Sequence, residues 1–155
     1  MTSKNQLQNK IQELESELNS FKQQLNSYKE TTIENAVVGD TLEDGCIVVQ
    51  KSNGLALLVA PENTEVFTSW SKEFPEVSQK LKEQGFNPSQ FFIPTKEQLR
   101  LAYEVIPQKF SSTRYWSSTE YTATSSCGVY FDRGNAGNHR KTRLGCVRAF
   151  RCVTY

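Results

Sequence analysis

The residues best suited to chemistry lie in one stretch near the carboxyl end of the chain, together with Tyr121. The stretch is rich in amide and charged side chains: Asp132, Arg133, Asn135, Asn138, His139, Arg140, Lys141 and Arg143. Gly134 and Gly137 allow it to bend, and it has no apolar residue larger than Ala136 to anchor it in a core. Amides exchange hydrogen bonds and arginines hold anions. We therefore expect these residues and Tyr121 to form a ligand-binding loop region.

Catalysis has little support in the sequence. His139 is the only histidine, so no second one is present to complete a catalytic cluster. Glu120 and Asp132 are the acids that a glycosidase pair would need, but nothing in the sequence places them together. Acids in loops are usually solvated. We expect no enzyme activity, no catalytic residues and no cofactor.

The four cysteines do not indicate a metal site. Cys46, Cys127, Cys146 and Cys152 form no C-x-x-C pair, and the single histidine argues against a zinc site. We expect the cysteines to be small buried side chains in strands. A disulfide stays open as an alternative, although it would need an oxidising compartment.

Positive charge gathers at the carboxyl end although the net charge of the chain is only +1. Residues 133–155 contain no Asp or Glu and six cations: Arg133, Arg140, Lys141, Arg143, Arg148 and Arg151. The last two fall in a strand pattern and are expected to pair with acids elsewhere. The other four favour a sulfated, phosphorylated or carboxylated ligand. Nucleic acid is not the expected partner, because exposed aromatic residues do not alternate with the cations.

A long amphipathic helix is predicted over residues 1–32. Its apolar residues recur at alternating spacings of four and three: Leu7, Ile11, Leu14, Leu18, Phe21, Leu25 and Tyr28. Such a narrow stripe needs copies of itself for burial. Lys10 with Glu15, and Glu17 with Lys22, would attract each other between parallel helices in register. Leucine at two of three a positions and bulky d residues favour a parallel trimer, with a two-stranded or antiparallel coil as the alternative.

Residues 37–155 are predicted to fold as an α+β domain. Asn53-Gly54 lies between two apolar runs and predicts a hairpin. Residues 67–81 show a helical apolar face that Pro75 interrupts. Thr95 and Gln98 form a capping box for a helix that ends at Pro107. Short strands are expected at 115–116, 127–131 and 145–153.

Several motifs of this domain carry a resemblance to a known family. "FFIPTKEQL", "YWSSTEY", "VYFDRGN" and "VRAFR" follow one another in that order. Residues 37–151 resemble the C-terminal domain of the Legionella collagen-like adhesin, which is similar to the C-type-lectin fold and occurs in phage and bacterial surface proteins.

The resemblance implies a rigid C-type-lectin-like scaffold. In it the "YWSST" segment packs inward, and the loops between the last strands contact the ligand. The Glu-Pro-Asn and Trp-Asn-Asp motifs of calcium-binding lectins are absent from the sequence, so we expect no metal. The formylglycine-generating relatives use active-site cysteines, but Cys127, Cys146 and Cys152 have a strand-like context here.

We expect a trimeric receptor-binding or adhesion protein that displays this head to a surface glycan or an outer-surface protein. The sequence has no apolar stretch of the length that a secretory signal or membrane span needs, so we expect no membrane insertion. This favours a bacteriophage fibre or virion decoration protein, assembled in the host cytoplasm and displayed on the virion surface. An extracellular or cell-surface adhesin is the alternative location. The alternative function is a structural virion assembly or capping protein, docked to other virion proteins through the stalk.

Overall fold

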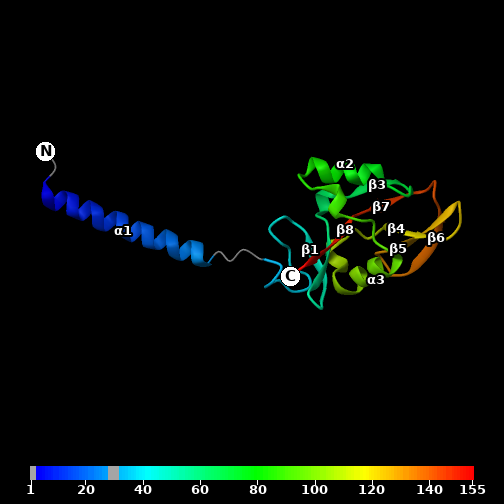
Figure 1. Cartoon of the computed structure of the whole chain (residues 1–155), viewed down its shortest axis with the longest axis horizontal. Coiled ribbons are helices and arrows are strands. Elements are labelled where there is room, and N and C mark those ends of the chain that lie inside the picture. The colour runs from blue at the N-terminus through cyan, green and yellow to red at the C-terminus, as the bar shows by residue number, and fades with distance from the viewer. Residues whose placement is uncertain (1–2, 28–31) are drawn as a thin grey trace. The chain divides into compact units, whose positions relative to one another are not determined.

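The computed structural model describes residues 3–27 and 32–155, except for the side chains of 25–27 (Figure 1). The chain divides into two compact units, residues 1–30 and 31–155. The predicted stripe positions Leu25, by its side chain, and Tyr28 lie outside the described residues.

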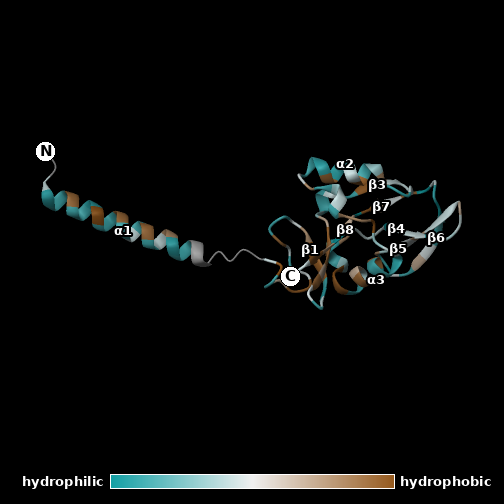
Figure 2. Ribbon diagram, in the orientation of Figure 1, coloured by the Kyte–Doolittle hydropathy of each residue, from teal (hydrophilic) through white to brown (hydrophobic). Residues whose placement is uncertain are grey.

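The described part of the first unit forms the helix α1 (Lys4–Ser27). Ser3 caps it, because the Gln6 amide donates to Ser3 Oγ (3.3 Å) and the Ser3 amide donates to Gln6 Oε1 (2.9 Å). The apolar stripe appears as bands that alternate with hydrophilic residues along the helix (Figure 2). Its described members are all more than half exposed: Leu7, Ile11, Leu14, Leu18 and Phe21. No described residue of this unit covers the stripe.

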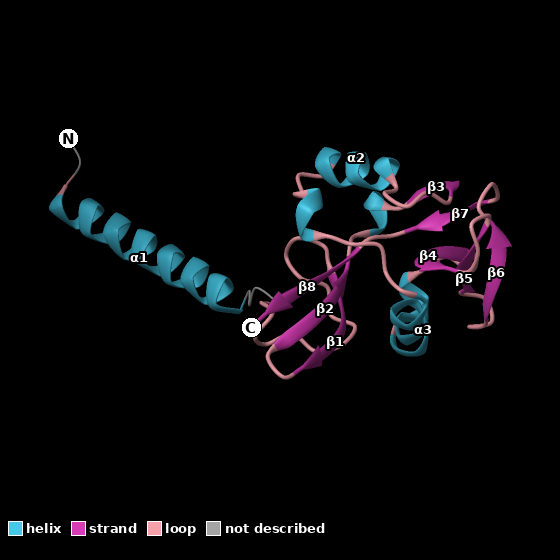
Figure 3. Ribbon diagram, turned by 45° about the vertical axis from the view of Figure 1, so that its right-hand side comes forward, coloured by secondary structure: helices cyan, strands magenta, loops and turns pink. Residues whose placement is uncertain are grey.

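The second unit combines helices with two sheets, so the α+β class expected from the sequence is confirmed (Figure 3). One sheet has three antiparallel strands in the order β1 (Ile47–Ser52), β2 (Leu55–Val59) and β8 (Phe150–Thr154). The predicted hairpin joins β1 to β2. Its turn residues Asn53 and Gly54 have φ angles of 53° and 75°, as a tight two-residue turn requires.

The other sheet has five strands in the order β3-β7-β4-β5-β6. Their bounds are β3 (Val66–Ser69), β4 (Arg114–Glu120), β5 (Ser125–Tyr130), β6 (Ala136–Arg140) and β7 (Leu144–Val147). Only β4 and β7 pair in parallel. Strands β3 and β6 form the two edges.

Two of these strands correct the sequence-based expectations. β3 replaces the first part of the predicted helical face, because its residues pair with β7. β6 lies inside the stretch that we expected to be a loop. Its Gly, Asn, His and Arg residues have low strand propensity, but pairing with β5 fixes them in a sheet.

The two helices of this unit begin at local signals in the sequence. α2 (Pro75–Glu83) has Pro75 in its first turn. α3 (Lys96–Val105) has the predicted capping box, in which the Gln98 amide donates to Thr95 Oγ1 (3.2 Å). Three short 3-10 turns cover Glu62–Thr64, Pro88–Gln90 and Pro107–Lys109. α2 and α3 lie on opposite sides of this unit (Figures 1 and 3).

The core holds the aromatic motif of β4. Tyr115, Trp116 and Ser117 are buried. Trp116 packs among residues of α2 such as Val77 and Leu81, and its Nε1 donates to the carbonyl oxygen of Thr68 (3.2 Å). The inward packing that the resemblance implied for these three residues is present in the structure.

The expectation of buried cysteines is correct for three of the four. Cys46, Cys127 and Cys146 are buried, and burial raises the pKa of the Cys46 and Cys146 thiols to about 12. Cys152, in the edge strand β8, is exposed. All four are free thiols in this structure.

Candidate ligand-binding site

The predicted ligand-binding residues do not form one loop, because β6 runs through the middle of them. In the pairing with β5, His139 lies opposite Ser126 and Asn138 lies opposite Cys127. Successive side chains of a strand point to opposite faces of the sheet. His139 is therefore on one face, whereas Asn138 and Arg140 are on the other.

Residues 131–135, which connect β5 to β6, form a tight turn. It lies at the opposite end of β6 from the β6–β7 turn. The Gly134 amide donates to the carbonyl oxygen of Tyr130 (2.7 Å), and Gly134 has a φ of 80°. A β-carbon at this position would overlap the ring of Tyr103 in α3, so the turn lies against that helix. Asp132 and Arg133 pair with each other in the turn (3.4 Å). Exposed Asn135 completes it, because its carbonyl oxygen accepts from the Tyr130 amide (3.0 Å).

Lys141 is committed to internal contacts. Its Nζ lies 2.9 Å from Glu120 Oε2 and 3.0 Å from the carbonyl oxygen of Ala123, and it sits 4.4 Å from the ring centre of Trp70. It therefore joins the β4–β5 turn to the β6–β7 turn. The sequence predicted Lys141 as a ligand-binding residue, and in the structure its ammonium group already has these partners. Tyr121 is in the same β4–β5 turn and is 67% exposed.

The face of the sheet that carries His139 also carries Arg114, Trp116, Ser126 and Tyr130. Strand register shows this, because Arg114 lies opposite Tyr130 in β5, and Ser126 lies opposite His139 in β6. We call Arg114, Ser126, Tyr130 and His139, with Arg143 of the β6–β7 turn, the arginine-histidine face.

Glycines keep this face flat. A β-carbon at Gly128 would lie 3.0 Å from Arg114 Cγ, and one at Gly145 would lie 3.0 Å from Trp116 Nε1. Without these β-carbons the Arg114 side chain runs across the sheet. Its guanidinium lies 5.0 Å from the Trp116 ring centre and donates to the carbonyl oxygen of Leu144.

The electrostatics of the arginine-histidine face favour an anion. Burial lowers the pKa of His139, and the nearby cations Arg114 and Arg143 lower it further. Among the described residues, the two arginines of this face, Arg114 and Arg143, have no ion-pair partner. The face therefore presents uncompensated positive charge beside a neutral imidazole.

Unsatisfied polar atoms also gather on this face. Arg114 Nε, Ser126 Oγ and His139 Nε2 are buried without a hydrogen-bond partner among the described residues. Buried polar atoms normally have partners, so such atoms mark places where a ligand can supply them. Arg114, Ser126 and Tyr130 were not among the ligand-binding residues predicted from the sequence. The only signal for Arg114 was its i, i+2 spacing from Trp116, which puts both on one face of a strand.

The two acids considered as a glycosidase pair are not brought together. Glu120 lies opposite Ser126 at one end of β5, and Asp132 follows the other end. Six strand residues span roughly 20 Å, which is about twice the separation that such a pair can have.

The two strand arginines differ in their partners. Arg151 lies 3.6 Å from Asp44, as expected. Arg148, which is only 1% exposed, has no acid at ion-pair distance and donates instead to the carbonyl oxygens of Ala60 (2.7 Å) and Lys109 (2.6 Å). The expectation of an acidic partner is therefore wrong for Arg148.

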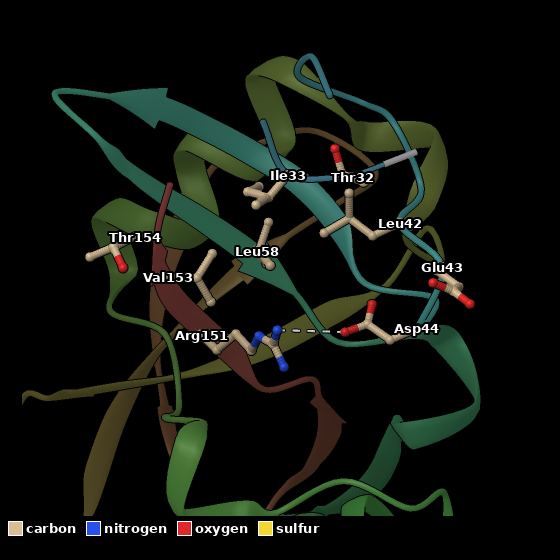
Figure 4. Close-up of a pocket in the computed structure, with 9 residues that line it drawn as sticks. All are labelled: Thr32, Ile33, Leu42, Glu43, Asp44, Leu58, Arg151, Val153 and Thr154. Carbon is tan, nitrogen blue, oxygen red and sulfur yellow. Dashed lines mark ion pairs between the residues drawn. The ribbon is translucent and has the colours of Figure 1, made fainter. Parts of the chain in front are cut away.

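A separate cavity of about 560 Å³ lies beside the three-stranded sheet (Figure 4). It has an apolar part and a charged part, and none of the predicted ligand-binding residues lines it. The lining residues are Thr32, Ile33, Leu42, Glu43, Asp44, Leu58, Arg151, Val153 and Thr154.

Within residues 3–27 and 32–155, no three His, Cys, Asp or Glu side chains are grouped to hold a metal ion. No helix in this part of the chain is both long and apolar enough to cross a membrane. The sequence matches no protein-family model, and a search of curated proteins finds no significant match. The family resemblance therefore depends on the quoted motifs alone.

Proposed function

We propose that the protein is a trimeric receptor-binding or adhesion protein, in which α1 clusters three C-type-lectin-like heads. The observation that carries the proposal is the exposed stripe of α1. Leu7, Ile11, Leu14 and Leu18 are each more than half exposed, in a helix that is otherwise polar. A helix of this kind gains stability by packing against copies of itself. Clustering is useful to a weak binding site, since it raises the apparent affinity of the assembly.

The proposed binding surface of each head is the arginine-histidine face. Its cations lack acidic partners and its buried polar atoms lack hydrogen-bond partners. The ligand it suits is a carboxylated, sulfated or phosphorylated group of a surface glycan or outer-surface protein. Asn138 and Arg140 are on the opposite sheet face, so the proposed surface includes only part of the predicted set.

The proposed location is the surface of a bacteriophage virion, as a fibre or decoration protein. The motif order of residues 37–151 supports this, because the resembled family occurs in phage and bacterial surface proteins. The alternative is a structural capping protein, which would bind no receptor.

The test is a glycan array that carries sulfated, phosphorylated, carboxylated and neutral glycans, probed with the full chain. Arg143→Glu should abolish binding to the anionic glycans, because it reverses the exposed charge beside His139. Arg133→Glu is the matched control. Arg133 is also exposed, but it lies in the turn at the far end of β6 and pairs with Asp132. Wild-type binding should weaken as salt is added.

The outcomes separate the hypotheses. Equal loss in the Arg133 and Arg143 variants would move the site away from the arginine-histidine face. The full chain could also bind no glycan on the array, and its binding to cell surfaces could stay unchanged when salt is added. That result would show that the ligand is not anionic.

A further inference from the structure

The outer edge of β8 is open over two residues. The Tyr155 amide donates to the carbonyl oxygen of Gly54 in the β1–β2 turn (2.9 Å), so odd-numbered residues of this segment bond toward β2. Backbone groups of neighbouring strand residues point to opposite edges. Cys152 and Thr154 therefore direct their N–H and C=O groups to the outer edge. No backbone partner there is found among the described residues, and both residues are exposed.

One residue of the chain already pairs with the outer edge of β8. Phe92 and Phe150 exchange two backbone hydrogen bonds, of 2.8 and 2.9 Å, on the outer edge of β8. Just before Phe92 the chain turns away through the 3-10 turn Pro88–Gln90. The open groups that remain are spaced by roughly 6.8 Å, two residues of a strand. Another extended backbone is the chemical partner that matches them.

The cavity of Figure 4 lies beside this edge. Arg151 and Val153 of β8 form part of its wall, and Ile33 and Leu42 lie across from them. If another strand paired with β8, one of its residues would lie opposite Val153. The side chain of that residue would be on the same face of the sheet as Val153, because paired residues share a face. The aliphatic lining there suits an aliphatic side chain.

The charges at the cavity favour an added strand that carries a basic residue near its aliphatic one. Asp44 lies 3.6 Å from Arg151, which also lies over the Phe91 ring at 5.5 Å. Glu43 is exposed and has no ion-pair partner among the described residues. An occupant with a lysine or arginine would supply one.

We propose that the outer edge of β8 and the adjacent cavity form a docking groove for an extended segment of another protein. The segment adds a strand to the three-stranded sheet. It places an aliphatic side chain in the cavity opposite Val153 and a basic side chain near Glu43. This mode of recognition draws affinity from main-chain hydrogen bonds and specificity from side-chain pockets. It is independent of the arginine-histidine face.

The first test uses a displayed library of random eight-residue peptides, selected against the immobilised full chain. The selected peptides should combine alternating aliphatic residues with a lysine or arginine. Thr154→Pro removes an outward amide donor at a position where an edge strand tolerates proline, and it should weaken their binding by tenfold or more. Thr154→Val keeps the amide and is the matched control. Glu43→Lys should weaken only the peptides that carry a basic residue.

A hydrogen-exchange measurement on the full chain tests the same groove without any variant. In the free protein the amides of Cys152 and Thr154 should exchange faster than those of Arg151 and Val153. A selected peptide should slow the exchange of Cys152 and Thr154. The proposal is overturned if no peptide is selected, if the selected peptides bind Thr154→Pro as tightly as wild type, or if they leave these amides unprotected.

Discussion

His139 links the stability of the head to pH. Burial and the cations Arg114 and Arg143 lower its pKa in the folded state below the usual 6.5. The unfolded chain therefore binds a proton at a pH where the folded head does not. The contribution of His139 to stability is fully present above the unfolded pKa and is lost as the pH falls below it.

His139→Gln removes this proton linkage. The variant should lose less of its free energy of unfolding between pH 7.5 and pH 5 than the wild type does. Urea unfolding of both proteins at the two pH values measures the difference. If both lose the same stability, His139 does not titrate with a lowered pKa.

Trp116 is expected to be a structural residue and not a ligand contact. It is fully buried, and its indole donates to the backbone of β3. Trp116→Ala should lower the free energy of unfolding by about 3–5 kcal/mol. Tyr121→Ala, at an exposed aromatic residue, should change it by less than about 0.5 kcal/mol. Thermal or chemical unfolding compares the two, and a folded Trp116 variant that has lost only binding would contradict this role.

At the scale of the element, the spacing of the apolar residues in α1 favours a coiled coil. A buried layer formed by Leu18 in a coiled coil has no partner for a carboxylate, so Leu18→Asp should dissociate the assembly. Asn19→Asp adds the same charge one residue later, at a position outside the stripe, and should leave the assembly intact. Sedimentation equilibrium on the full chain should give a trimer mass for wild type and control, and a monomer mass for Leu18→Asp. A wild-type monomer or dimer would contradict the proposed trimer.

The sheet edges show how one element can decide the role of several residues. The alternation of β6 puts His139 on the face of Arg114, and puts Asn138 and Arg140 on the other. The pairing of β8 with β2 leaves Cys152 and Thr154 open. Neither result depends on residue type alone. The register with β5 sets which face each β6 residue occupies, and the pairing with β2 sets which edge of β8 stays open.

At the scale of the whole molecule, clustering should dominate the strength of attachment. Joining several weak sites raises apparent affinity by about 10²–10⁴ when the geometry allows simultaneous contact. The dissociated Leu18→Asp chain should therefore bind far more weakly than wild type to a surface densely coated with an anionic glycan. The glycan used is one that the wild type binds on the array. The dissociated chain should keep the same affinity for the soluble monovalent glycan. Surface plasmon resonance and calorimetry measure the two quantities. Equal surface binding by both chains would mean that trimerisation does not serve attachment.

The amino-acid sequence by itself determined the features that depend on neighbours along the chain. The heptad spacing predicted a helix at 1–32, Asn53-Gly54 predicted the first hairpin, and Thr95 with Gln98 predicted the start of α3. These signals are local, because a turn or cap depends on backbone angles and hydrogen bonds within four residues. The α+β class followed from their order.

Only the tertiary structure decided which side chains share a surface. β6 is polar and has low strand propensity, so it becomes a strand only because β5 pairs with it. That pairing separates Asn138 from His139, brings Arg114 and Ser126 to the face of His139, and leaves Lys141 held by Glu120 and Trp70. These relations join residues up to about 70 positions apart, and no local pattern encodes the register that sets them.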